Sequence, residues 1–205
     1  MKKIFAILLV LTMALSVFAL AGCGDNGDGG EVDNTDHKLE AIKTALSATD
    51  PASTDIEIKA VTTLGVTLEG EYNVTYNSDG SATVEYSYDK LNEAGSDELV
   101  SRVDGYATIA QDGTVSGDIS ATVAGAATKS FNLDPAKLKS YSAEEGSLVA
   151  IIAAENVEAL LGTAISGLVS DVTISMFAND GEITSVSLAY THSLAGAVTV
   201  ECVYN

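Results

Sequence analysis

The chain has 205 residues, of which 10 are basic and 29 acidic, so its formal net charge is −19 at neutral pH. This excess of acid excludes nucleic acids and anionic lipid headgroups as electrostatic partners, because both are negatively charged themselves. With 46% hydrophobic residues, the chain has enough apolar material for one sizeable core.

The amino-terminal segment has the features of an export signal. Lys2 and Lys3 are followed by an uncharged apolar run over residues 4–20. The run ends in Leu20-Ala21-Gly22-Cys23, which resembles the lipobox of bacterial lipoproteins. The resemblance implies that residues 1–22 are removed as a signal peptide, that the Cys23 thiol carries a diacylglycerol, and that the new amino end is acylated. Two acyl groups hold a protein stably on a membrane.

Residues 23–36 are rich in glycine and acidic residues and are expected to form a flexible tether from the lipidated cysteine to a single domain over residues 37–205. Removal of Lys2 and Lys3 with the signal peptide gives a mature charge of 8 − 29 = −21. Cys202 then has no cysteine to pair with. It alternates with Val198, Val200 and Tyr204 on one face of a predicted strand, which predicts a small buried apolar side chain.

Two helices and one short helical turn are predicted. Residues 36–47 have one apolar stripe, with Asp36 able to cap the start. Residues 153–162 form the second helix, which is expected to end at Gly162. Asp134-Pro135 has the composition of a short helix start, with the aspartate as cap and the proline at the first helical position.

From residue 55 onwards apolar and polar residues alternate, which predicts strands. An unbroken strand over residues 56–76 would be about 70 Å long, so the chain must turn back. Across a three-residue hairpin loop that ends in glycine, the inward-facing residues keep the same parity: they are even-numbered in both strands or odd-numbered in both strands. Six triplets fit this rule: Thr63-Leu64-Gly65, Ser78-Asp79-Gly80, Gln111-Asp112-Gly113, Glu144-Glu145-Gly146, Asn179-Asp180-Gly181 and Leu194-Ala195-Gly196.

This register predicts a meander of roughly nine to eleven antiparallel strands. It includes a strand over residues 115–123 with Ile119, Ala121 and Val123 facing inward, and it places Val149 and Ile151 inward after the fourth turn. One face of the strands is apolar and the other is rich in Thr, Ser, Asn and Glu. The predicted fold is therefore α+β, with a large curved antiparallel sheet that resembles half a barrel and two or three helices on one face.

This order of elements resembles the LolA/LppX-type half-barrel lipoproteins, which carry lipids or lipoproteins in the hollow of the sheet. The stretch "GEYNVTYNSDGSATVEYSYDKLNE" over residues 70–93 is also similar to small uncharacterised lipoproteins of Gram-positive gut bacteria. Together with the lipobox, these resemblances imply an extracytoplasmic protein that is lipid-anchored to the cell membrane of a Gram-positive bacterium.

The sequence has no G-x-S-x-G, H-E-x-x-H or C-x-x-C motif and no phosphate-binding loop. Of its two histidines, His37 lies at the start of a predicted helix and His192 is expected to be a solvated residue at a turn. We therefore expect no catalytic residue, no metal ligand and no cofactor, and we expect that the protein is not an enzyme.

Four tyrosines, Tyr72, Tyr76, Tyr86 and Tyr88, are predicted to share one face of neighbouring strands. They form either an aromatic row that stabilises the sheet or the wall of an apolar ligand cleft. The leading hypothesis is non-catalytic binding of a lipid or another apolar ligand in the hollow of the sheet. The alternative is a module without a small ligand that docks a protein or cell-wall partner through an edge strand or its acidic face.

Overall fold

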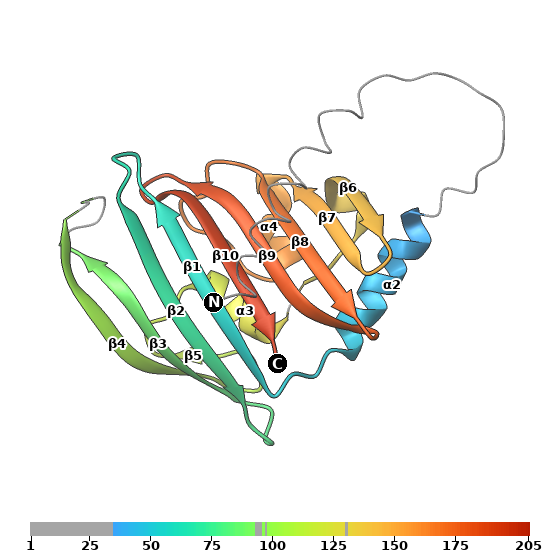
Figure 1. The fold of residues 1–205 in the computed structure, drawn as a ribbon, viewed down its shortest axis with the longest axis horizontal. Coiled ribbons are helices and arrows are strands. Elements are labelled where there is room, and N and C mark those ends of the chain that lie inside the picture. The colour runs from blue at the N-terminus through green and yellow to red at the C-terminus, as the bar shows by residue number, and fades with distance from the viewer. Residues whose placement is uncertain (1–34, 93–95, 97, 130) are drawn as a thin grey trace. The chain divides into compact units, whose positions relative to one another are not determined.

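A computed structural model of the protein describes residues 35–205 apart from 93–95, 97 and 130 (Figure 1). The predicted signal peptide, Cys23 and all but the last two tether residues lie outside the described residues. Thr35–Asn205 forms one compact unit with its own apolar core, so a chain that begins after Cys23 keeps every contact described below. None of the described helices combines the length and the apolar character needed to cross a bilayer.

The ten strands of the described part of the chain belong to one antiparallel, curved sheet (Figure 1). They are β1 (Ser53–Val61), β2 (Thr67–Tyr76), β3 (Ala82–Leu91), β4 (Leu99–Ile109), β5 (Val115–Ser116), β6 (Leu138–Glu144), β7 (Ser147–Ile152), β8 (Val172–Asn179), β9 (Glu182–His192) and β10 (Gly196–Tyr204). The chain runs outward from β1 to β5 at one edge, crosses to β6 at the other edge and returns to β10, which pairs with β1. The predicted curved antiparallel sheet is confirmed, as two five-stranded meanders joined at the β1–β10 pair.

Among the described residues, three α-helices and two short 3-10 helices accompany the sheet. They are α2 (Thr35–Ala48), α3 (Ala121–Thr128), η1 (Pro135–Lys137), η2 (Ala154–Asn156) and α4 (Val157–Leu161). The α-helices put buried side chains into the same core as the inward face of the strands, which confirms helices on one face of the sheet. The predicted helices are found as α2, η1 and η2–α4, and Gly162 ends α4 with a φ of +70°. Because α2 begins at Thr35, Asp36 lies in its first turn, where its carboxylate accepts a hydrogen bond of 2.6 Å from the Tyr141 hydroxyl.

The predicted strand over residues 115–123 is wrong beyond Ser116, because the chain forms helix α3 from Ala121. The Ser120 hydroxyl caps this helix by accepting from the Val123 N–H at 3.2 Å, and Lys129 closes it with a left-handed backbone. The segment is dominated by alanine, the best helix former, and its inward-facing Val123 fits a helix as well as a strand. The alternating pattern was therefore ambiguous here, and Ser120 was the signal for a helix.

Three of the predicted hairpin turns have the expected geometry. Gly65, Gly80 and Gly113 all have φ near +80° and each closes a three-residue loop. The residue before each loop donates its N–H to the residue after it, in the pairs Thr62–Val66, Asn77–Ser81 and Ala110–Thr114. Inward residues keep their parity across these turns, as predicted.

The other three turns differ in detail. Glu145-Gly146 is a two-residue loop, so parity switches, and Leu148, Ala150 and Ile152 face inward instead of Val149 and Ile151. Asp180-Gly181 is also a two-residue loop, with both φ angles positive, and a bulge next to it restores the predicted parity. The last loop covers residues 193–195, and Gly196 pairs with His192.

Cys202 is a free cysteine with 1% of its surface exposed, so the predicted small buried side chain is confirmed. Burial raises the pKa of its thiol to about 12, and the neighbouring Glu201 contributes in the same direction. The thiol is therefore protonated at physiological pH and contributes to the core as an apolar group.

Thr49 joins helix α2 to strand β9 and gives a first test of the fold. Its buried hydroxyl donates to the Ala45 carbonyl at 2.7 Å and accepts from the Ile183 N–H at 2.8 Å. We expect Thr49→Val to lower the free energy of unfolding in urea by about 1–3 kcal/mol, because the buried Ile183 N–H loses its partner. Thr44→Val is the control, since the Thr44 hydroxyl makes the same kind of bond on an exposed face, and it should cost less than about 0.5 kcal/mol. Equal losses would contradict this role of Thr49.

Candidate functional site

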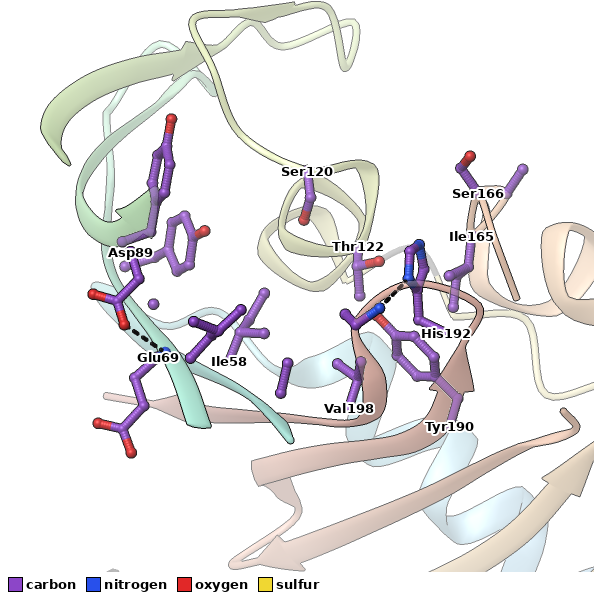
Figure 2. A pocket seen from close by; sticks show the side chains of 17 residues that line it. Ile58, Glu69, Asp89, Ser120, Thr122, Ile165, Ser166, Tyr190, His192 and Val198 are labelled. Carbon is purple, nitrogen blue, oxygen red and sulfur yellow. Dashed lines mark hydrogen bonds between the residues drawn. The ribbon is translucent and has the colours of Figure 1, made fainter. Parts of the chain in front are cut away.

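A cleft of about 510 Å³ opens on the inward face of the sheet, beneath the start of α3 and the segment that follows α4 (Figure 2). The strands supply its floor through Ile58, Ala60, Leu68, Gly70, Tyr72, Tyr190 and Val198. The opposite wall consists of Ser120, Thr122, Ala164, Ile165 and Ser166. Most of this lining is apolar, with hydroxyl groups from Ser120, Thr122 and Ser166 on the α3 side.

Small residues in the centre of the sheet leave the space for this cleft. Ala60 lies between Leu68 on β2 and Val198 on β10. Next to it, Gly70 pairs with Ile58 and has no side chain, which lets the Tyr72 ring lie over its backbone, 3.0 Å from where a Cβ would be. The sheet therefore has its hollow where β1, β2 and β10 meet, and that place is fixed by the pairing of the first strand with the last.

The four predicted tyrosines are divided between two places. Tyr72 and Tyr88 line the cleft, and Tyr86 lies between them, with ring centroids 6.0 Å from Tyr72 and 5.6 Å from Tyr88. This row also covers strand glycines, because a Cβ at Gly105 would come within 2.5 Å of the Tyr86 hydroxyl. The same row is thus an aromatic ladder on the sheet and one wall of the cleft.

Tyr76 lies in a second cavity, of about 660 Å³, on the other side of α3. Its hydroxyl donates to the Ala127 carbonyl at 2.7 Å and lies 2.9 Å from the Thr54 hydroxyl. The Lys129 ammonium is 5.8 Å from the centre of its ring and donates to the Thr49 carbonyl at 2.5 Å. Tyr76 therefore fastens α3 to the sheet, while α3 separates the two cavities.

Hydrogen bonds and burial determine the position and the protonation state of the tyrosine hydroxyls at the cleft. The Tyr88 hydroxyl donates to the Asp118 carboxylate at 2.7 Å, and this bond raises the pKa of Tyr88 to about 12. Burial raises the pKa of Tyr190, and Thr122 lies within hydrogen-bonding reach of it. Both tyrosines therefore stay neutral at physiological pH.

Two acidic residues lie at one end of the cleft, and Lys59 pairs with one of them, its ammonium 3.3 Å from the Glu69 carboxylate. Two of the described lining residues are carboxylates, Glu69 and Asp89, and none is a lysine or an arginine. Asp89 is fixed near the backbone of β2, where it accepts from the Glu69 N–H at 3.5 Å. Figure 2 shows both at the end of the cleft opposite His192 and Ser166.

His192 lies at the end of β9 beside a turn, as predicted, but it lines the cleft and is not fully exposed to solvent. Its ring is half-buried, and Nδ1 accepts the N–H groups of Leu194 and Ala195 at 3.1 and 3.0 Å. The imidazole thus holds the turn over residues 193–195 in place. Sequence spacing could indicate the turn but not this use of the ring. Across the described part of the chain, no three His, Cys, Asp or Glu side chains come together as a metal site would require.

No model of a known protein family matches the chain, and neither does any curated protein sequence. Similar solved structures include LprF from Mycobacterium bovis, with a TM-score of 0.43, 12% identity, and coverage of 83% of this chain and 92% of LprF. A putative outer membrane lipoprotein-sorting protein domain from Vibrio parahaemolyticus is similar with a TM-score of 0.29, 10% identity, and coverage of 84% and 92%. A DUF1329 family protein from Desulfovibrio piger has a TM-score of 0.27, 9% identity, and coverage of 85% and 94%.

The resemblance to LolA-type half-barrel proteins that the element order suggested is thus found again among these similar structures. The likeness is distant and concerns the course of the chain, so it carries no information about a ligand. The residues of the cleft are the basis for the function proposed below.

Proposed function

We propose that the protein is a membrane-anchored extracytoplasmic lipoprotein that binds a lipid or another apolar molecule in the cleft without chemically changing it. The observation that carries the proposal is the apolar cleft of about 510 Å³ on the inward face of the sheet. Its volume lies within the range of about 300–1,000 Å³ that is usual for small-molecule sites. Tyr72 and Tyr88 are the ligand-facing tyrosines in this proposal.

The anchor belongs to the same proposal. A diacylglycerol on Cys23 would hold the chain on the outer surface of the cell membrane, as in Gram-positive bacteria. Residues 24–34 precede α2 and would span roughly 20 Å as a flexible coil. The cleft would then stay within reach of the bilayer, where apolar molecules are concentrated.

The charges at the cleft restrict the charge that the polar head group of the ligand can carry. Of the two charged residues that line the cleft, Glu69 is paired with Lys59 at 3.3 Å, whereas Asp89 takes part in none of the ion pairs of the described residues, and the mature chain as a whole carries −21 (8 − 29). A carboxylate or phosphate head would meet like charge there, whereas a neutral or cationic head would not. The proposed ligand is therefore an apolar molecule with a neutral or cationic polar end.

The test uses residues 24–205, freed of bound lipid by organic extraction, with three amphiphiles that share one alkyl chain and end in an amine, an alcohol or a carboxylate. Native mass spectrometry below the micelle concentration should show one added mass for the amine and the alcohol. The carboxylate should bind about tenfold more weakly, because of repulsion by the acids at the cleft.

Two results would contradict the proposal at different points. If none of the three amphiphiles adds mass, the protein does not bind apolar ligands in this cleft. If the carboxylate binds best, the cleft holds apolar molecules but the assignment of the head group is wrong. Asp89→Asn should reduce the difference in affinity between the amine and the carboxylate, since it removes the unpaired charge with almost no change in the shape of the cleft.

A further inference from the structure

The two edges of the sheet are protected to different degrees. At the β6 edge, strand β6 contains Lys139, has a bulge between Leu138 and Ser140, and packs against helix α2. Lysine, bulges and covering helices are the usual means by which proteins block an edge strand from pairing with another chain. At the other edge, β5 pairs only with Thr108 and Ile109 of β4, and Gly117 lies beside Ala107 and the Tyr106 carbonyl, so no described strand pairs with the outer side of β4 before Thr108.

The open part of β4 is free of proline and lysine and is unusually apolar for an exposed segment. Val100 has 55% of its surface exposed and Tyr106 has 71%. Between them lie Arg102, the only arginine of the chain, and Asp104. These four residues have the same parity and therefore share one face of the sheet.

The backbone groups that point outward from this strand can be identified. Ala110 donates its N–H to Thr114 on the β5 side. Hydrogen-bonded residues alternate along an antiparallel pair, so even-numbered residues of β4 present their N–H and C=O groups to the outer side. Arg102, Asp104 and Tyr106 thus carry outward backbone groups, and Val103 binds inward to β3 opposite Tyr88.

This strand is complementary to itself. If two copies pair antiparallel about a two-fold axis at Val103, Arg102 of each copy lies opposite Asp104 of the other. In the same register Val100 lies opposite Tyr106. The two copies then exchange backbone hydrogen bonds at the pairs of even-numbered residues, whose N–H and C=O groups point outward from β4. One register therefore aligns the hydrogen bonds, two opposite-charge pairs and two apolar pairs at once.

The existing contacts of these side chains leave room for this arrangement. Arg102 reaches the Ser87 hydroxyl at 3.3 Å and Glu71 at 4.0 Å, both on the exposed surface, where such contacts are weak. Asp104 takes part in none of the ion pairs of the described residues. Ligand binding is not needed for this pairing, because the cleft lies on the inward face.

We propose that the protein forms a symmetric homodimer in which the β4 strands of two copies pair antiparallel over residues 100–106, with Val103 on the two-fold axis. One sheet then continues through both copies, and its outer edges are the two protected β6 strands. This inference does not depend on the proposed ligand, so either can fail without the other.

The test is sedimentation equilibrium of residues 24–205 at increasing concentration, for the wild type and four variants. The wild type should show a reversible monomer–dimer equilibrium. Arg102→Asp or Asp104→Arg alone should weaken dimerisation about tenfold, because each replaces two attractive pairs with two repulsive ones. The double variant Arg102→Asp/Asp104→Arg exchanges the charges and should return the dissociation constant to near the wild-type value.

Asp104→Pro is the fourth variant. It removes an outward N–H that the sheet itself does not use, so the monomer should fold with unchanged circular dichroism while the dimer is lost. A wild-type chain that stays monomeric up to about 100 µM would overturn the proposal. A dimer that survives Asp104→Pro would overturn the use of this edge, and failure of the double variant to recover would overturn the register.

Discussion

Replacing Ala60 with phenylalanine should strongly weaken ligand binding and leave the fold intact. Ala60 is 7% exposed and lies in the floor of the cleft between Leu68 and Val198. A phenylalanine ring there would occupy space that is empty in the free protein. We expect the affinity for the amine or alcohol amphiphile to fall about tenfold or more, as measured by native mass spectrometry or isothermal titration calorimetry. The free energy of unfolding should not fall, because the ring fills a void and gains apolar contacts.

Val61→Phe is the matched control for this substitution. Val61 is the next residue on β1, points to the opposite face of the sheet and is 40% exposed. It introduces the same ring outside the cleft, so the affinity should stay within about twofold of the wild type. If Ala60→Phe keeps full affinity, the ligand does not bind in this cleft. A large loss of stability would instead mean that the floor is packed more tightly than the cavity indicates.

Gly196→Ala should be among the most destabilising single substitutions in the protein. Gly196 begins β10 with a φ of +73°, and an added Cβ would collide with the Val61 carbonyl oxygen and lie 3.2 Å from the Thr62 Cα. The positive φ alone costs alanine roughly 1–2 kcal/mol, and backbone atoms cannot move aside as a side chain can. We expect a loss of roughly 3 kcal/mol or more in the free energy of unfolding, measured in urea.

Gly65→Ala separates the two causes. Gly65 has a similar φ of +79°, but nothing lies within 4 Å of an added Cβ. Its substitution should therefore show the cost of the backbone conformation alone, about 1–2 kcal/mol. If the two substitutions cost the same, the β9–β10 turn must shift to accept the methyl group, and the close approach of β10 to Val61 is not rigid.

The sheet could be predicted well because its pattern is redundant. Many residues alternate between a buried and an exposed face, and glycines mark the turns, so one wrong loop length does not change the overall register. Where only two residues form the loop, as at Glu145-Gly146, the parity rule gave the wrong inward residues for β7. Helix α3 was missed because its eight residues are small and apolar and show little contrast between two faces.

The cleft could be predicted only in part. The tyrosines were visible as a row, and Tyr72 and Tyr88 do line the cleft. Its floor depends on the pairing of β1 with β10, and its opposite wall depends on α3. Neither follows from local pattern, because both are set by segments far apart along the chain. For the same reason the sequence did not indicate that Tyr76 fastens α3 to the sheet or that the His192 ring holds a turn.

The pairing of the first strand with the last also constrains the order in which the protein folds. Asp55 and Asn205 are 150 residues apart and yet share a hydrogen bond at the centre of the sheet. Closing so long a loop is slow, and the contacts within each half of the sheet are more local. The two halves should therefore form before the seam between them. Until β10 is available, one side of β1 has no partner strand and the floor of the cleft lacks Val198. The protein should therefore stay only partly folded, and of low stability, until its last strand pairs.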